Sequence, residues 1–231
     1  MKKIKSDRRK NYVDIYNYSR GKIIGSTVLM GLGQLMYGQI GKGLLYLGIQ
    51  FCALYFFISR GFNDILGLIN LGTQEANTWL NEAGDNSVIM LLMGILSVIA
   101  LILFIGCYIS NLKDIFNTQA RVMKGLKPIK FSDEIKSLMD KKFYKTVLFI
   151  PIIGVLVFNV LPIIFMIAIA FTNYGGSIVP PKLVDWVGID NFIQITTLSK
   201  LAPTFTKILS WNVLWAFVST GLNYFAGLGL A

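Results

Sequence analysis

The sequence predicts an all-α polytopic membrane protein with about four membrane-spanning helices and an interfacial or re-entrant helix near the N-terminus. Residues 147–172 form a run of 26 residues without a charge. As a helix, this run is longer than a hydrocarbon core of about 30 Å requires. Residues 88–109 and 211–231 are also uncharged, over 22 and 21 residues. Hydrophobic residues make up 54% of the chain, and its mean hydropathy is +0.60.

The first apolar stretch, residues 23–58, is interrupted by the glycine-rich sequence 38–43. Glycine permits tight turns and close backbone packing. We therefore expect one span from about Gly43 to Ile58, preceded by an interfacial or re-entrant helix that begins near Ile23. A single long, tilted or kinked span over the whole stretch is the alternative.

Lysine and arginine are concentrated in alternate loops between these runs. Residues 1–22 carry eight Lys or Arg against two Asp or Glu, and residues 110–146 carry nine against four. Residues 59–87 carry one against four, and residues 173–210 carry three against two. Because loops rich in Lys and Arg stay on the cytoplasmic side, we expect a multi-pass plasma-membrane protein with a cytoplasmic N-terminus. The same pattern explains the net charge of +10 by membrane topology, so we expect the lipid bilayer and no nucleic acid as a partner.

Within the second basic loop, residues 131–143 predict an amphipathic helix on the inner leaflet. Ser132 is placed to cap this helix, and Asp133 and Glu134 in its first turn suit the helix dipole. Lysines surround an apolar face, as is typical of helices at a membrane surface, and that face contains Ile135, Leu138 and Met139. We expect this helix to act as a cytoplasmic linker before the next span.

The sequence provides few groups for catalysis or metal binding. It contains no histidine, and its two cysteines, Cys52 and Cys107, lie in apolar runs, so His-based triads and zinc sites are excluded. Lys42 is flanked by glycines as in a phosphate-binding loop, but Met36 replaces the leading glycine and no Ser or Thr follows the lysine. We therefore expect no catalytic residue, metal site or cofactor in this chain, and no enzymatic activity.

Several polar residues and two prolines lie in the apolar runs. The glutamines and asparagines could line a solute path or bond a neighbouring helix, and they are Gln34, Gln39, Gln50, Asn159, Asn212 and Asn223. Pro151 and Pro162 are expected to kink the long span. None of the uncharged runs holds a carboxylate of the kind that secondary transporters use for ion coupling. Energy for transport would therefore come from another subunit or from a part of the protein outside this sequence.

Three ordered motifs follow from the long run onward. The run closes in Phe171-Thr172-Asn173-Tyr174, the loop contains Trp186-Val187-Gly188-Ile189-Asp190-Asn191-Phe192, and the last run opens at Asn212. This order and spacing resemble the sugar permeases of binding-protein-dependent ABC importers. Their first core helix ends in an SFTNY-like sequence, an FVGLxNF-like loop follows, and the next helix opens with an NT-like pair. The chain departs from this pattern at Ala170 and Val213, where Ser and Thr are usual.

The resemblance is closest to the maltose and maltodextrin permeases of Gram-positive bacteria, whose N-terminal membrane extension resembles the glycine-rich segment 31–43. It implies three parts: a basic cytoplasmic tail at 1–22, the N-terminal membrane extension with its amphipathic linker at 23–143, and the start of the permease core at 144–231. The residues that match the family motifs are Pro162, Phe171, Thr172, Asn173, Tyr174, Gly188, Asn191, Phe192 and Asn212. The resemblance identifies no substrate-contacting residue here, and we expect the ATPase-docking loop to lie beyond Ala231, which makes the chain an N-terminal fragment.

The resemblance implies a permease subunit that forms part of a carbohydrate translocation path, with maltose or maltodextrin as the substrate. Its expected partners are a second permease subunit, a cytoplasmic ATPase subunit that binds ATP, and an extracytoplasmic sugar-binding protein. The alternative is a membrane scaffold or sensor without a transport role, because glycine-rich N-terminal hairpins also occur in unrelated membrane proteins.

Overall fold

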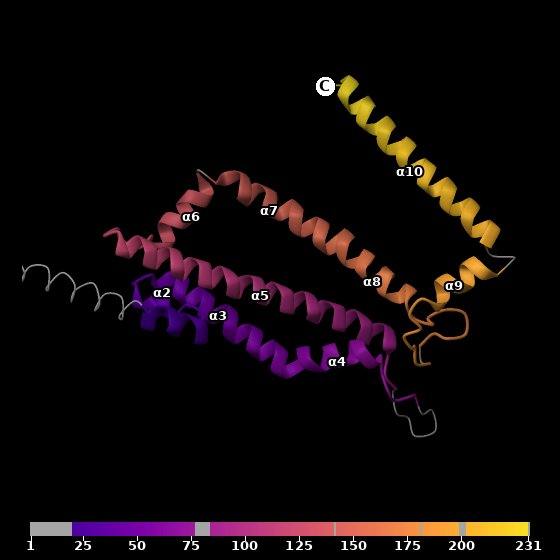
Figure 1. Ribbon diagram of the computed structural model, residues 1–231, viewed down its shortest axis with the longest axis horizontal. Helices are drawn as coiled ribbons and strands as arrows, with labels where there is room; N and C mark the ends of the chain where they lie inside the picture. The colour runs from indigo at the N-terminus through magenta and orange to yellow at the C-terminus, as the bar shows by residue number, and fades with distance from the viewer. Residues whose placement is uncertain (1–19, 77–83, 141, 181, 199–201, 231) are drawn as a thin grey trace, which may run out of the picture. The chain divides into compact units, whose positions relative to one another are not determined.

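The computed structural model describes residues 20–76, 84–140, 142–180, 182–198 and 202–230. These residues form helices and connecting turns, with two isolated β-bridges and no strand among them (Figure 1). Four helical segments are long and apolar enough to cross a membrane: Ile40–Asn70, Ser87–Met123, Phe143–Ala170 and Ala202–Leu230. The predicted all-α, polytopic class is therefore confirmed.

The N-terminal apolar stretch is divided by two glycine turns. Residues 20–28 are helical, and a turn leads into the short helix α2 (Leu32–Met36) and then into α3 (Ile40–Phe56). Gly31 and Gly38 adopt φ values of 87° and 77°, which L-residues with a side chain rarely adopt. A Cβ on Gly31 would also lie 2.2 Å from the carbonyl oxygen of Gly43. The structure thus has a separate helix before the first span, in place of one long span.

The first span is longer than the sequence predicted. After α3, a π-helical turn η1 (Phe57–Gly61) leads into α4 (Phe62–Asn70), so the expected end near Ile58 and the expected loop from residue 59 are wrong. The charges that suggested a loop are accommodated by packing on the next helix, since Asp64 accepts a hydrogen bond from Ser97 Oγ at 3.1 Å.

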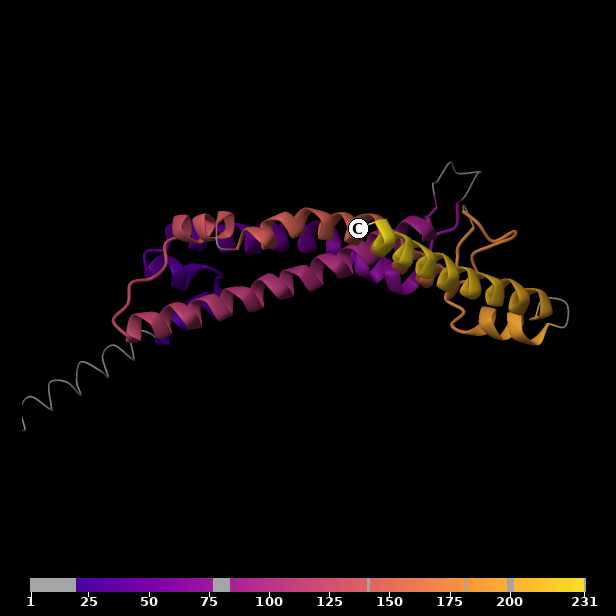
Figure 2. The same cartoon turned by 90° about the horizontal axis from the view of Figure 1, so that it is seen from above.

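The second span, α5 (Ser87–Met123), begins with a side-chain cap, because Asn86 accepts a hydrogen bond from the backbone N–H of Ile89. It lies beside α4, as both views show, and it also contacts α3 (Figures 1 and 2). Gly94 makes this packing close: a Cβ at that position would lie 2.4 Å from Leu68 Cβ.

A short helix joins the second span to the third. This helix, α6 (Phe131–Met139), confirms the expected helix but ends before residue 143, since Phe143 begins the next helix. Lys130 occupies the N-cap position without a side-chain hydrogen bond. The expected cap at Ser132 is therefore wrong. Phe131 packs on Gly41 and is already helical, which places Ser132 inside the first turn.

The third span contains both prolines of the long apolar run. It consists of α7 (Phe143–Val155), a π-helical turn η2 (Leu156–Val160) and α8 (Leu161–Ala170). Pro162 has no N–H to donate, and its ring would meet the carbonyl four residues earlier in a regular helix. The wider π-helical turn directly before it relieves this conflict.

The described residues form two compact units. The first comprises those up to Gly72 and those from 86 to 165, and the second comprises those from 73 to 85 and from 166 to 230. The second unit holds a short helix, α9 (Asp190–Thr197), and the last span, α10 (Ala202–Leu230). The expected outer loop 173–210 is thus shorter than predicted, because Lys207 lies within α10.

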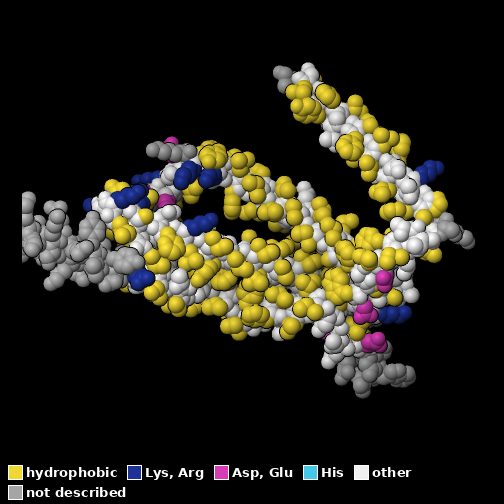
Figure 3. Space-filling model, in the orientation of Figure 1, with side chains coloured by type: hydrophobic (Ala, Val, Ile, Leu, Met, Phe, Trp, Pro, Cys, Tyr) yellow, Lys and Arg dark blue, Asp and Glu magenta, His cyan; other side chains and the backbone are white. Residues whose placement is uncertain are grey.

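Apolar side chains cover the exposed sides of the spans, and Lys and Arg gather where α6 meets α7 (Figure 3). Phe158 is 78% exposed and Phe217 is 77% exposed. Aromatic side chains left uncovered to this extent suit contact with lipid tails better than contact with water.

Candidate functional site

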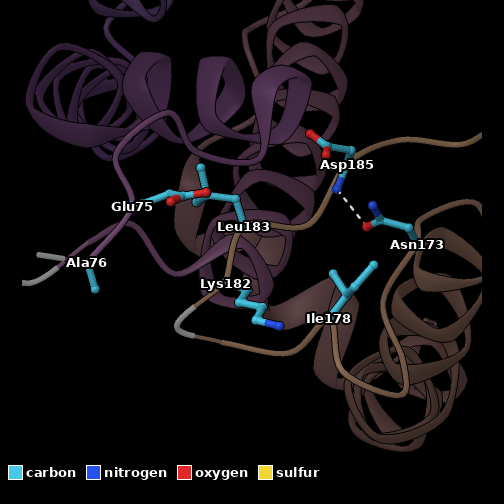
Figure 4. A pocket seen from close by; sticks show the side chains of 7 residues that line it. All are labelled: Glu75, Ala76, Asn173, Ile178, Lys182, Leu183 and Asp185. Atoms are coloured by element: carbon cyan, nitrogen blue, oxygen red, sulfur yellow. Dashed lines mark hydrogen bonds between the residues drawn. The ribbon is translucent and has the colours of Figure 1, made fainter.

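Most of the sequence-motif residues meet where α8 ends. The backbone N–H of Asn173 donates to Asp185 O at 3.0 Å, and the N–H of Asp185 donates to Asn173 Oδ1 at 2.8 Å (Figure 4). The N–H groups of Val187 and Gly188 both donate to the carbonyl of Phe171, at 2.9 and 3.1 Å. The segment after α8 is therefore paired with the segment before α9.

Asn191 completes this junction with its side chain. Its Nδ2 donates to the carbonyls of Ala170 at 2.9 Å and Thr172 at 2.7 Å. Carbonyls at the end of a helix have no partner within the helix, so an amide with two hydrogens can satisfy both. Thr172 is 2% exposed, and its hydroxyl donates to Ile169 O at 2.8 Å.

An aromatic contact and a glycine turn accompany these hydrogen bonds. The rings of Phe171 and Phe192 lie 5.3 Å apart between centroids, which is a favourable packing distance for aromatic side chains. Gly188 has φ 60°, which allows the chain to turn into α9. Three positions of the FVGLxNF-like motif, Gly188, Asn191 and Phe192, thus have structural roles at one junction.

Two motif residues lie outside this hydrogen-bonded junction, and a third lies at its edge. The N–H of Tyr174 donates to Thr172 Oγ1 at 3.3 Å, and its side chain is 41% exposed. Pro162 lies earlier, in the first turn of α8, and Asn212 lies on α10 with an exposed side chain.

An open pocket of about 380 Å³ lies beside the junction (Figure 4). Its lining combines both signs of charge with an amide and aliphatic side chains: Glu75, Ala76, Asn173, Ile178, Lys182, Leu183 and Asp185. Such groups can hydrogen-bond a hydroxylated solute or a protein surface. Among the described residues no group of three His, Cys, Asp or Glu side chains is arranged to hold a metal ion.

The ends of the loop that supplies Glu75 are held together by Asp85. Its carboxylate accepts the N–H groups of Thr73 at 2.8 Å and Gln74 at 3.0 Å. These hydrogen bonds favour the charged form and hold the pKa of Asp85 below its usual value.

The glutamines of the N-terminal apolar stretch bond within the protein. Gln34 Nε2 donates to Asn111 Oδ1 at 3.0 Å, and Gln39 Nε2 donates to Ile129 O at 2.7 Å. Gln50 Oε1 accepts the N–H of Met30 at 2.7 Å. For these three the packing interpretation holds. The choice between packing and a solute path stays a prediction for the exposed asparagines Asn159, Asn212 and Asn223.

Sequence reasoning missed a buried polar cluster in the first unit. At its centre Lys42 pairs with Asp114 and Glu134, and its side chain is only 6% exposed. The available signal was a lysine inside an otherwise apolar stretch, which needs a carboxylate partner when it is buried.

Comparison with known proteins gives consistent results. The chain is 33% identical over 205 residues to the maltodextrin transport system permease protein MalC of Streptococcus pneumoniae. This match covers 87% of the present chain and 45% of MalC. The chain is 30% identical over 204 residues to MdxF of Bacillus subtilis, also a maltodextrin transport system permease protein, with the same coverage. It is 34% identical over 214 residues to GanP of Bacillus subtilis, a galactooligosaccharides transport system permease protein, covering 89% of this chain and 48% of GanP.

No protein-family model and no solved structure matches the chain. The chain spans about half the length of the curated relatives it matches, while those matches extend over nearly nine-tenths of the chain itself. They therefore include both the N-terminal spans and the junction after α8. With its four apolar spans, this chain is a multi-pass membrane protein homologous to the permease proteins of Gram-positive maltodextrin and galactooligosaccharide transport systems.

Proposed function

We propose that the chain is part of the transmembrane permease subunit of an ABC importer for an oligosaccharide, with maltodextrin as its substrate. The observation that carries this proposal is the identity of 33% and 30% to two maltodextrin permease proteins across nearly the whole chain. The four apolar spans supply the membrane-crossing elements that such a subunit requires.

The proposed partners are a second permease subunit, a cytoplasmic ATPase and an extracytoplasmic sugar-binding protein. In this arrangement ATP is hydrolysed by the partner and not by this chain, which carries no phosphate-loop sequence. The glycines around Lys42 resemble those of a phosphate-binding loop only superficially, and the ammonium group of Lys42 is paired with the carboxylates of Asp114 and Glu134.

The proposed orientation places the N-terminus and α6 in the cytoplasm and the pocket of Figure 4 outside the cell. The excess of Lys and Arg in residues 1–22 and 110–146 supports this orientation. We further propose the division inferred from the sequence, with a basic tail at 1–22, an N-terminal membrane extension at 23–143 and the start of the permease core at 144–231.

Galactooligosaccharide is the second candidate substrate, because the identity to the galactooligosaccharide permease protein is 34%. Uptake of labelled sugars distinguishes the two candidate substrates. It is measured in cells that lack the gene, with and without complementation by the full-length protein and its partner subunits. Maltodextrin uptake that depends on the gene is the expected result. Uptake of galactooligosaccharide alone would assign the second substrate, and uptake of neither sugar would refute the proposed function.

A further inference from the structure

Three segments of the first unit meet where α5 ends and α7 begins. They are residues 37–43, which comprise the turn at Gly38 and the start of α3, the polar second half of α5, and α6. Each contributes charged or polar side chains to a cluster around Lys42, which lies in the first turn of α3 and is nearly buried.

Lys42 binds two carboxylates from two different helices. Its Nζ lies 3.0 Å from Oδ1 of Asp114 on α5 and is also hydrogen-bonded to Oε1 of Glu134 on α6. The other oxygen of Asp114 accepts a hydrogen bond from Gln34 Nε2 at 3.3 Å. Because a buried ammonium group is costly unless it is paired, this charge favours a state in which α3, α5 and α6 are held together.

Two further contacts hold α6 against the turn. Gln39 Nε2 donates to the carbonyl of Ile129, directly before α6, and Gln39 Oε1 accepts from Thr118 on α5 at 3.4 Å. Phe131 lies against Gly41, where a Cβ would come within 2.8 Å of the ring. The ion pair of Lys42, the side-chain amide of Gln39 and the contact of Phe131 with Gly41 therefore connect α6 and the segment before it to residues 37–43.

Hydrogen bonds connect α6 to the start of the third span. The N–H of Lys142 donates to Ser137 O at 2.8 Å, and Thr146 Oγ1 donates to Leu138 O at 3.0 Å. These hydrogen bonds connect the last turn of α6 with the first turn of α7. A shift of α6 must therefore displace the start of the span Phe143–Ala170.

We infer that Lys42 is a positioning residue, whose charge holds α6 through Glu134 and thereby fixes where the third span begins. The inference reaches beyond the proposed function, because it assigns a task to the N-terminal turn and not to the solute path. Only its transport readout rests on the proposed function.

The first test measures backbone amide exchange of the full-length protein in lipid nanodiscs. Glu134→Gln removes the negative charge that pairs α6 with Lys42 and leaves Lys42 paired with Asp114, so the exchange of residues 134–139 should rise at least about threefold while α5 is unchanged. Asp133→Asn is the matched control, because it removes an exposed acid from the same first turn. Equal exchange in these two variants would overturn the inference.

A second variant tests whether Lys42 and Glu134 act as one unit. Lys42→Met should raise the exchange of α6 and also of α5 near Asp114, and Lys42→Arg should restore most of the protection. The double variant Lys42→Met/Glu134→Gln should exchange in α6 no faster than Lys42→Met alone. Additive effects of the two single substitutions would contradict a shared ion pair.

The third measurement is sugar uptake by the complete transporter at equal protein in the membrane. Glu134→Gln should lower the maximal rate and leave the half-saturating sugar concentration unchanged, while Asp133→Asn should match the wild type. Faster exchange with unchanged uptake would make the ion pair a purely structural contact and refute the positioning role. If the wild type itself transports no sugar, the proposed function fails, and the exchange measurements still decide whether Lys42 holds α6.

Discussion

At the end of α8, two main-chain carbonyls receive their hydrogen bonds from one amide group, that of Asn191. The bonds link residues about twenty positions apart and join the end of a span to the start of α9. A single side chain thereby reinforces the main-chain hydrogen bonds between the segment after α8 and Asp185, Val187 and Gly188.

Asn191→Ala should destabilise this junction by about 1–3 kcal/mol, because two carbonyls lose their donor. Asn191→Asp should be at least as harmful, since its carboxylate would face both carbonyl oxygens. The melting temperature of the purified protein in detergent checks both variants. Gln194→Ala, on an exposed position of α9, is the control and should melt like the wild type.

Asp85 is expected to make the loop between α4 and α5 sensitive to acid. Its pKa is lowered by the N–H groups of Thr73 and Gln74, so the folded loop binds the proton less tightly than the unfolded chain. The stabilising effect is therefore complete above the unfolded pKa of about 3.9 and is lost as the pH falls through the lower folded value.

Amide protection at Thr73 and Gln74, corrected for the intrinsic exchange rate, should consequently be high near neutral pH and fall in acid. Asp85→Asn should lack most of this protection at either pH, whereas Glu75→Gln should retain it. Full protection in Asp85→Asn would show that the two hydrogen bonds do not hold the loop.

At the scale of whole elements, the third span is interrupted by η2, between the two prolines. A π-helical turn widens the helix locally and often marks a functional position. Here it directly precedes Pro162, the residue that would otherwise clash with the preceding turn.

Pro162→Ala should allow residue 162 to donate to the carbonyl of Phe158 and should convert η2 into regular helix. In the full-length protein we expect normal amounts in the membrane but altered sugar uptake or altered coupling of ATP hydrolysis to uptake. Pro151→Ala, within the regular part of α7, is the comparison. Uptake and ATPase activity both at the wild-type level in Pro162→Ala would show that the interruption serves packing alone.

At the scale of the whole molecule, the alternation of loops rich and poor in Lys and Arg predicts which ends of the spans face the cytoplasm. In a cysteine-free background, single cysteines at Glu75 and Lys182 should react with an impermeant thiol reagent added to intact cells. A cysteine at Lys130 should react only after the membrane is opened. Labelling at Lys130 from outside would reverse the proposed orientation.

Asn77, a further possible labelling position in the sequence between α4 and α5, lies outside the residues that the structure describes. Glu75 replaces it because its side chain is exposed at the start of the same loop.

The sequence was sufficient for the spans because the absence of charge is a local property. The uncharged run 147–172 corresponds to the helical segment Phe143–Ala170, which begins four residues earlier and ends two residues earlier than the run. The predicted end of the first span was wrong, because Asp64 lies within a helix. Its carboxylate accepts a hydrogen bond from Ser97, which is 33 positions away in the chain. No local pattern reveals such a partner.

The candidate site shows the same limit. Asn191 and Gly188 were identified only through resemblance to a family, since nothing in their spacing shows that an amide would meet the end of α8. The pairing of Lys42 with Glu134 was not predicted, because the two residues lie 92 positions apart and belong to segments with different hydrophobic patterns. Contacts of this kind depend on tertiary packing and become visible only in three dimensions.

The length of α5 has a consequence for the depth of the polar cluster. At about 1.5 Å per residue, its 37 residues reach about 55 Å, well beyond a hydrocarbon layer of about 30 Å. If the uncharged half of α5 occupies that layer, then Asn111 and Asp114 stand at the level of the lipid headgroups, where a charge is far less costly than among the acyl chains. A thicker bilayer would bring both residues closer to the acyl chains. We therefore expect the stability of the Lys42 ion pair to depend on the thickness of the bilayer.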